Sequence, residues 1–147
     1  QLRPRNFAAA LAQGRSLAPW IARLNAIRRA HPALQQLRTL HFHPTNHESL
    51  LAYSKTDPAT DDAILCVVTL EPYTTVSGTV SLDLPALGMR WQDRFLVHDE
   101  VSGETYDWGE FNYVQLEPWR SVAHILRLQR LAVATPATAS ITADGRP

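Results

Sequence analysis

The stretch that decides the fold is LAPWIARLNAIRRAHPAL, residues 17–34, because it carries the only convincing helical pattern in the chain. Large apolar side chains recur in it at helical spacing and form one stripe, made of Leu17, Trp20, Ile21, Leu24 and Ile27, with Arg23, Arg28 and Arg29 left to the flanks. Ser16 stands where a side chain caps a helix, and Pro19 falls in the first turn, where its missing N–H removes no hydrogen bond. Pro32 pushes His31 out of the α region. The pattern therefore predicts a helix over residues 17–30.

Almost everything after this helix has the pattern of β-strands. Short apolar or alternating runs occupy residues 39–43, 50–55, 63–70, 76–84, 94–99, 104–108, 112–117 and 122–129. The run 63–70 is continuously apolar, which is typical of a central strand covered on both faces. The run 76–84 alternates and predicts one wet face, with Val80, Leu82 and Leu84 inward and Thr79, Ser81 and Asp83 outward. These features predict a mainly β fold, an antiparallel β-sandwich preceded by one α-helix.

Length and composition set the limits. The chain has 147 residues, 45% of them hydrophobic, so it can build one ordinary core but is too short for a (β/α)8 barrel of about 250 residues. No apolar run is long enough to span a bilayer. The first residue is Gln1 and no signal-peptide pattern follows, which indicates a truncated or processed end. Cys66 is the only cysteine, so a disulfide within the chain and a cysteine zinc cluster are excluded, and a cytoplasmic location is favoured.

The charge is balanced overall but divided along the chain. Residues 1–38 hold seven arginines and no acid, whereas residues 39–147 hold seven basic and fourteen acidic residues. A basic arm can indicate nucleic-acid binding, but no Lys-rich run and no interleaved aromatic residues accompany it. Attraction between the basic segment and a neighbouring acidic surface explains the division better.

Two sets of residues raise the question of a metal or catalytic site. His41 and His43 would project from the same face of a strand, and with His47 they form a weak zinc-like pattern that packed or surface histidines explain better. The acids of the hairpin region could supply a glycosidase pair, but their polar and turn neighbours favour a solvated rim; they are Asp99, Glu100, Glu104, Asp107, Glu110 and Glu117.

Three further patterns favour structural roles. Asp57, Asp61 and Asp62 lack the glycine and the terminal glutamate of a calcium loop. Cys66 lies within the apolar run, where a thiol is inert packing. The aromatic residues favour packing over a sugar-stacking platform, which stays open as the alternative; they are Trp91, Tyr106, Trp108, Tyr113 and Trp119. The sequence thus assigns no catalytic, substrate-binding or metal-ligating residue to this chain, and it implies no cofactor.

Several segments resemble a known enzyme family. RLNAIRRAHPAL at 23–34 resembles the last barrel helix of the α-amylase superfamily, glycoside hydrolase family 13. Further segments resemble the actinobacterial alpha-1,4-glucan:maltose-1-phosphate maltosyltransferases: LRTLHFH at 37–43, LLAYSK at 50–55, VHDEVSGETYDW at 97–108, NYVQLEP at 112–118 and AHI at 123–125. The resemblance covers residues 1 to 129, and the opening QLRPR resembles the segment just after that family's last barrel strands.

The resemblance implies a domain organisation and an activity. Residues 1–36 would be the end of a catalytic barrel, 37–130 a C-terminal β-sandwich, and 131–147, rich in Ala, Thr and Pro, a disordered tail. The whole enzyme would transfer maltosyl from maltose 1-phosphate to the non-reducing end of an α-1,4-glucan, with retention, in α-glucan biosynthesis. Its Asp nucleophile and Glu acid/base would lie upstream of Gln1, so this chain alone is predicted to be inactive.

The resemblance also implies partners and leaves alternatives. Maltose 1-phosphate and α-glucan would bind through the barrel, the whole enzyme is expected to be a cytoplasmic homodimer, and neither nucleic acid nor membrane is expected as a partner. One alternative is an autonomous β-sandwich that binds glycan or protein. Another is the C-terminal domain of a family 13 starch hydrolase.

Overall fold

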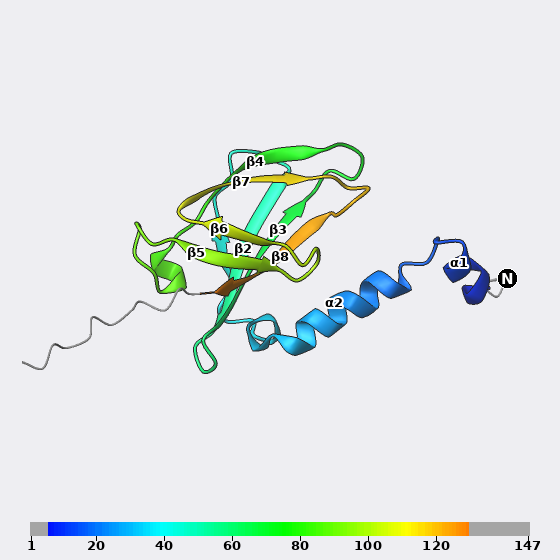
Figure 1. The fold of residues 1–147 in the computed structure, drawn as a ribbon, viewed down its shortest axis with the longest axis horizontal. Helices are drawn as coiled ribbons and strands as arrows, with labels where there is room; N and C mark the ends of the chain where they lie inside the picture. The colour runs from blue at the N-terminus through cyan, green and yellow to red at the C-terminus, as the bar shows by residue number, and fades with distance from the viewer. Residues whose placement is uncertain (1–5, 130–147) are drawn as a thin grey trace, which may run out of the picture.

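The computed structural model describes residues 6–129, and its elements follow the predicted order (Figure 1). Two helices and a 3₁₀ turn come first: α1 (Phe7–Ala12), α2 (Ala18–Ala30) and η1 (Pro32–Gln35). Eight strands and a second 3₁₀ turn follow: β1 (His41–His43), β2 (Leu50–Asp57), β3 (Asp62–Thr69), β4 (Val76–Ser81), η2 (Pro85–Leu87), β5 (Phe95–Asp99), β6 (Thr105–Trp108), β7 (Phe111–Leu116) and β8 (Ala123–Gln129). The expected tail, 131–147, lies outside the described residues.

The strands form two antiparallel sheets packed face to face, which confirms the predicted sandwich. The larger sheet has six strands in the order β1-β2-β3-β8-β5-β6, and the smaller sheet pairs β4 with β7. Figure 1 shows β4 and β7 over one face of the larger sheet and α2 beyond the other face. Among the described residues, no helix is both long and apolar enough to cross a membrane.

The strand β3 lies between β2 and β8 and is covered on both faces, as its apolar run predicts. Leu65 and Val67 point into the core between the two sheets, where they meet residues such as Phe95. Ile64 and Cys66 point the opposite way, into a second cluster on the helix side. The period of two along one strand therefore builds two separate apolar layers.

The outward and inward assignments in β4 and the residues after it are confirmed. Val80, Leu82 and Leu84 are fully buried, whereas Thr79, Ser81 and Asp83 are partly exposed and belong to the other face. The strand β4 ends at Ser81, three residues earlier than predicted, and η2 begins at Pro85, whose ring nitrogen has no N–H to donate.

The main helix begins at Ala18, one residue later than predicted. Leu17, the residue before it, already has helical φ and ψ, and the Ser16 hydroxyl accepts a hydrogen bond from the Ala18 N–H at 3.2 Å, which is the contact expected of the predicted capping residue. Pro19 lies in the first turn, and His31 ends the helix in an extended conformation just before Pro32, both as predicted.

The apolar stripe of α2 is only partly covered by the sandwich. Ile27 is buried against Ile64, Cys66 and Ile125, with Leu24 half-buried beside it. Leu17 and Ile21, nearer the start of the helix, remain 71% and 52% exposed. Strands β3 and β8 therefore cover the C-terminal half of the stripe, and Leu17 and Ile21 in its first half stay exposed.

Polar contacts fix the same end of α2 to the sandwich. The Arg23 guanidinium donates to the backbone carbonyls of Glu100 and Val101, each at 2.8 Å. His31 lies between Asp62 on β3 and Glu100, with Nδ1 3.1 Å and Nε2 3.4 Å from the carboxylate oxygens. The sequence did not indicate these contacts, because they join positions that are tens of residues apart.

Candidate functional site

A groove of about 620 Å³ opens between β6 and β7, where the two sheets come close without sharing hydrogen bonds. Its apolar lining comes from Trp108, Val114, Leu116 and Leu126, and its polar lining includes Asp99, Ser102, Glu104, Tyr106, Gln115, Glu117, Arg120, Ser121 and His124. The volume is within the range of about 300–1,000 Å³ that ligand pockets occupy. The groove is therefore the first place to look for a binding or catalytic site.

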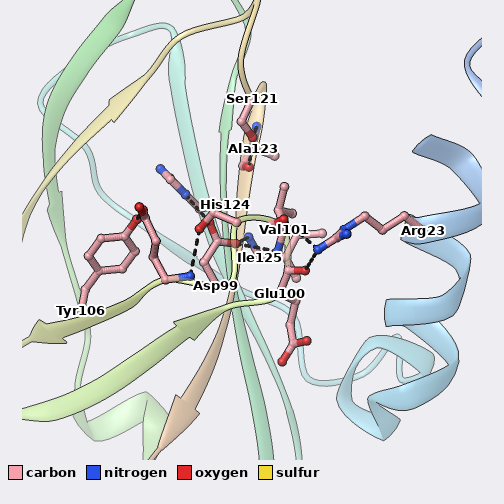
Figure 2. A network of polar contacts seen from close by, with 11 residues as sticks. Arg23, Asp99, Glu100, Val101, Tyr106, Ser121, Ala123, His124 and Ile125 are labelled. Carbon is pink, nitrogen blue, oxygen red and sulfur yellow. Dashed lines mark hydrogen bonds and ion pairs between the residues drawn. The ribbon is translucent and has the colours of Figure 1, made fainter. Parts of the chain in front are cut away.

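Asp99 is the centre of the polar network beside this groove (Figure 2). Its side chain is 1% exposed, and one oxygen, Oδ2, accepts from His124 Nδ1 at 2.8 Å and from the Ser102 hydroxyl at 2.9 Å. The other oxygen, Oδ1, accepts from the N–H groups of Val101 at 3.0 Å and Ile125 at 3.2 Å. Burial of a carboxylate is tolerated here because four donors surround it.

The network holds the Asp99 carboxyl in its ionised form. Burial acts to raise the pKa of Asp99, but the hydrogen bonds from His124, the Val101 N–H and Ser102 together outweigh it and keep the pKa below its ordinary value. On the groove side, burial and then the Glu104 carboxylate raise the pKa of Tyr106 to about 12, and the Tyr106 hydroxyl donates to Glu104.

The geometry of this network is that of a structural junction. Ser102 donates to Asp99 and not to His124, so the three side chains do not form the relay in which a histidine activates a serine nucleophile. Asp99 also closes the β5–β6 turn, because its carbonyl accepts from the Gly103 N–H at 2.7 Å. Gly103 has a φ of +82°, a conformation that glycine adopts at little cost.

The other acids of the proposed rim are divided among separate places. Glu104 and Glu117 line the groove, while Glu100 lies on the helix side with Arg127 and His31. Asp107 pairs with Arg94 at 3.0 Å on the exposed edge of β6. Their pairing with cations and hydroxyls fits the solvated rim that the sequence favours over a catalytic pair. For Asp99 the predicted rim position is wrong, because its side chain is buried beneath the β5–β6 turn.

The aromatic residues divide into one packed ring and several exposed ones. Trp108 is 7% exposed and belongs to the core, as the packing interpretation predicts, and Tyr106 is half-buried against that core. Tyr113, Trp119 and Trp91 are 66%, 70% and 49% exposed, so packing does not describe them. Phe111, which the sequence analysis did not single out, is 64% exposed on the same face of β7 as Tyr113.

The histidine pattern on β1 forms a packed pair beside an acid. The rings of His41 and His43 lie with centroids 5.0 Å apart, as their shared strand face predicts, and His41 Nε2 is 3.2 Å from Asp83. The His43 ring is buried, accepts from the Asp83 N–H through Nδ1 at 3.1 Å and contacts the Ser54 hydroxyl through Nε2 at 2.8 Å. Both of its nitrogens therefore have protein partners, and within residues 6–129 no group of three or more His, Cys, Asp or Glu side chains is placed to hold a metal.

His43 predicts a loss of stability in mild acid. Burial lowers its pKa to about 4, with His41 acting in the same direction and Asp83 against it. The unfolded chain binds this proton near pH 6.5, so the stabilisation is complete above pH 6.5 and is lost as the pH falls from 6.5 to 4. We expect about 2–3 kcal/mol of unfolding free energy to disappear in this window, measured by urea denaturation. His43→Gln, which does not titrate, is expected to give a flatter profile, and equal slopes for both proteins would contradict the assignment.

The remaining candidates are structural within the described residues. Burial raises the pKa of the Cys66 thiol, which keeps it protonated and inert, as expected. Asp62 binds His31 and the Ala33 N–H, and Asp57 accepts from the Thr60 hydroxyl at 2.7 Å. These aspartates organise the β2–β3 turn and the start of η1.

Comparison with known proteins shows to which family the sandwich belongs. A family model described as "GLGE, C-terminal" matches residues 42–128. The chain belongs to this GLGE C-terminal family. A Mycobacterium tuberculosis protein named alpha-1,4-glucan:maltose-1-phosphate maltosyltransferase is 58% identical over 128 residues, which are 87% of this chain and 18% of that protein. The protein of the same name from Mycolicibacterium smegmatis is 56% identical over 87% of this chain and 18% of its own length. Maltosyltransferase 2 of Streptomyces coelicolor is 48% identical over 91% of this chain and 20% of its own length.

The GLGE C-terminal match coincides with the sandwich. It begins in β1 and ends in β8, so it includes both sheets and the groove, and it leaves α1 and α2 outside. The relatives extend the similarity to 128 or more residues, which exceeds the sandwich itself. The chain spans about a fifth of the length of these curated relatives.

Proposed function

We propose that this chain is the C-terminal portion of an alpha-1,4-glucan:maltose-1-phosphate maltosyltransferase, a hexosyltransferase of α-glucan biosynthesis. The observation that carries the proposal is the 58% identity to a maltosyltransferase over 128 residues, together with the GLGE C-terminal match over the sandwich. The whole enzyme would transfer maltosyl from maltose 1-phosphate to the non-reducing end of an α-1,4-glucan, with retention.

The domain boundaries are part of the proposal. Residues 1–36 would end a catalytic barrel, 37–130 would form the C-terminal sandwich, and 131–147 would be a tail. The exposed Leu17 and Ile21 support a barrel contact for the first half of α2, because apolar side chains on one helix stripe usually meet another element. Cytoplasmic location and a homodimeric whole enzyme belong to the same proposal.

The chain's own role would be to hold α2 in place. The contacts from Arg23 and His31 to the β5–β6 turn and to β3, and the burial of Ile27, fix one end of the helix on the sandwich. The two carboxyls of a retaining mechanism, about 5 Å apart, would come from the barrel. A sandwich attached rigidly to the last barrel helix would keep the barrel closed without contacting the sugar.

Two measurements test this function. The 147-residue chain alone is expected to release no phosphate from maltose 1-phosphate above the buffer rate. A chimera in which this chain's residues replace the 128 matching residues of the Mycobacterium tuberculosis enzyme is expected to retain activity within about tenfold of the parent, because only distant packing changes. Phosphate release by the chain alone, or a folded but inactive chimera, would contradict the proposal.

The same assay separates the alternatives. If the chimera produces free maltose by hydrolysis and no longer extends the α-glucan, the sandwich is compatible with a starch hydrolase of family 13. If the chimera fails while the 147-residue chain binds maltoheptaose by itself, an autonomous glycan-binding module is the better description. Exposed rings such as Trp119 and Tyr113 are the observation that keeps this second candidate open.

A further inference from the structure

One edge of the small sheet has no partner strand. The Leu82 N–H donates to the Glu110 carbonyl at 2.8 Å, which fixes the hydrogen-bonding phase of the β4–β7 ladder. In an antiparallel ladder, alternate residues turn their backbone groups toward and away from the partner. The backbone N–H and C=O groups of Phe111, Tyr113 and Gln115 therefore face away from β4. Among residues 6–129, no strand and no backbone hydrogen bond meets them there.

The opposite edge of the same sheet is covered. The Thr79 carbonyl accepts from the Asn46 N–H at 3.1 Å, and the Ser81 N–H donates to the Pro44 carbonyl at 2.9 Å. The Asn46 side chain completes this cover by accepting from the Thr79 N–H at 2.7 Å. The chain thus closes the β4 edge with its own backbone and leaves the β7 edge open.

The open edge lacks the features that usually prevent strand pairing. Residues 111–116 contain no Lys, Pro or Gly, and β7 has no bulge in its register with β4. The neighbouring edge strand β6 is different, because Arg94 bonds both the carbonyl and the carboxylate of Asp107 at 3.0 Å. Of the two edges that border the groove, β7 is the one available for pairing.

The groove beside this edge has the shape and charge of a binding site for an extended peptide. Residues 113–117 line it along its length, and Trp108 and Leu126 supply an apolar wall that alternate side chains of an added strand would meet. Its accessible charged lining consists of Glu104 and Glu117 against Arg120, because Asp99 is buried and both of its oxygens already have donors. Asp107 and Arg94, in the adjoining hollow, cancel each other, so the excess is negative.

We propose that the open edge of β7 binds an extended, basic segment of another polypeptide, which adds to the small sheet as its third strand. The unpaired groups of Phe111, Tyr113 and Gln115 supply the ladder, and the groove accepts every second side chain of the added strand. The acidic lining selects basic residues at the ends of the segment. A two-stranded sheet is only marginally stable by itself, so a third strand also strengthens β4 and β7.

Charge argues against a second copy of this chain as the occupant. Residues 110–117 carry two glutamates and no basic residue, so the β7 strand of a second copy does not complement an acidic groove. Like charges repel, whereas a basic segment brings opposite charges to the groove. The chain's own residues 130–147 carry two arginines and one aspartate, without basic residues at both ends of a short apolar run.

The probe is a blocked octapeptide of alternating valine and threonine with arginine at each end, titrated into the isotope-labelled 147-residue chain. The amide N–H groups of Phe111, Tyr113 and Gln115 are expected to exchange with solvent at least about tenfold more slowly when the peptide is bound. Thr79, on the covered edge, is the internal control and is expected to change little. The same peptide methylated on alternate backbone nitrogens is expected not to bind, because it cannot complete the ladder.

Two substitutions at one position separate the backbone from the ring. Tyr113→Pro removes the outward N–H and, since prolines are tolerated on strand edges, leaves the β4 ladder in place; it is expected to weaken binding about tenfold. Tyr113→Ala removes the ring but keeps the N–H, and is expected to stay within about threefold of the wild type. Glu117→Gln is expected to weaken binding of the arginine-ended peptide and not of a glutamine-ended one.

The opposite results overturn the inference. Absence of binding up to about 1 mM peptide, equal binding of the methylated peptide, or wild-type binding by Tyr113→Pro would each do so. If Tyr113→Pro does not fold, the methylated peptide decides alone. Protection of the same three amides without peptide, lost on dilution or on deletion of 130–147, would assign the edge to a second copy or to the chain's own end. Protection by maltoheptaose that Tyr113→Ala abolishes would assign it to a glucan.

Discussion

Replacing Asp99 with alanine is expected to lower the free energy of unfolding by about 3–5 kcal/mol, which is a large part of the stability of a domain this size. The substitution leaves four donors without their acceptor: His124 Nδ1, the Ser102 hydroxyl and the N–H groups of Val101 and Ile125. Asp99 is 1% exposed, so water cannot replace the carboxylate without opening the β5–β6 turn.

Urea denaturation of three variants measures this effect. Ser102→Ala removes one donor and is expected to cost about 1 kcal/mol. Glu104→Ala removes an exposed carboxylate that accepts from the Tyr106 hydroxyl, and it is expected to cost less than about 1 kcal/mol. If Asp99→Ala cost no more than Glu104→Ala, the network would be a surface feature and not the junction that joins β5, β6 and β8.

The acid limb of the stability profile gives a second measure of Asp99. Its folded pKa lies below the unfolded value, so the unfolded chain takes up this proton first as the pH falls. The stabilisation is present above about pH 4 and is lost as the pH falls through the folded pKa. Asp99→Asn is therefore expected to be less stable at neutral pH and to lose less stability below pH 4 than the wild type does. Parallel acid limbs would contradict this assignment.

Local patterns were sufficient to predict the secondary structure. The apolar run 63–70 predicts a strand with two covered faces because Ile64 and Leu65 face opposite layers, and the structure confirms it in β3. The helix 17–30 could be read from its stripe and its two prolines, since both act within one turn of their own positions. The Ser16 hydroxyl caps the first turn as predicted, because it accepts from the Ala18 N–H.

Contacts between distant segments could not be predicted from the same patterns. Asp83 beside His41, and Arg23 on the carbonyl of Glu100, join residues whose proximity depends on strand order and helix placement. The open edge of β7 is of the same kind, because it follows from the β4–β7 pair standing apart from the larger sheet. Phe111 gave a signal that was missed: its alternation with Asn112 and Tyr113 places two rings on one face.

The helix α2 is attached to the sandwich mainly through one buried side chain near its C-terminal end. The helix has 13 residues, and a helix of that length is marginal in water without packing. Ile27 is the only buried side chain of α2, and it packs with Ala33, Ile64 and Ile125. The first half of the helix depends on this anchor, because Leu17 and Ile21 meet little of the sandwich.

Replacing Ile27 with aspartate is therefore expected to release α2 from the sandwich. The change removes a buried apolar side chain, worth about 2–5 kcal/mol, and would place an unpaired carboxylate among apolar neighbours. Amide exchange along residues 20–28 is expected to accelerate on the order of 100-fold or more, while β3 amides keep most of their protection because the core between the sheets is untouched.

Ile21→Asp is the matched control, because the same charge enters the same helix at a side chain that is 52% exposed. It is expected to change exchange along residues 20–28 by less than about tenfold, since the carboxylate stays in water. In the chimeric enzyme, Ile21→Asp is expected to lower activity if α2 contacts a barrel there, although the same substitution leaves the isolated chain intact. If Ile27→Asp and Ile21→Asp gave equal exchange in the isolated chain, the anchor would not be Ile27, and the Arg23 and His31 contacts alone would hold the helix.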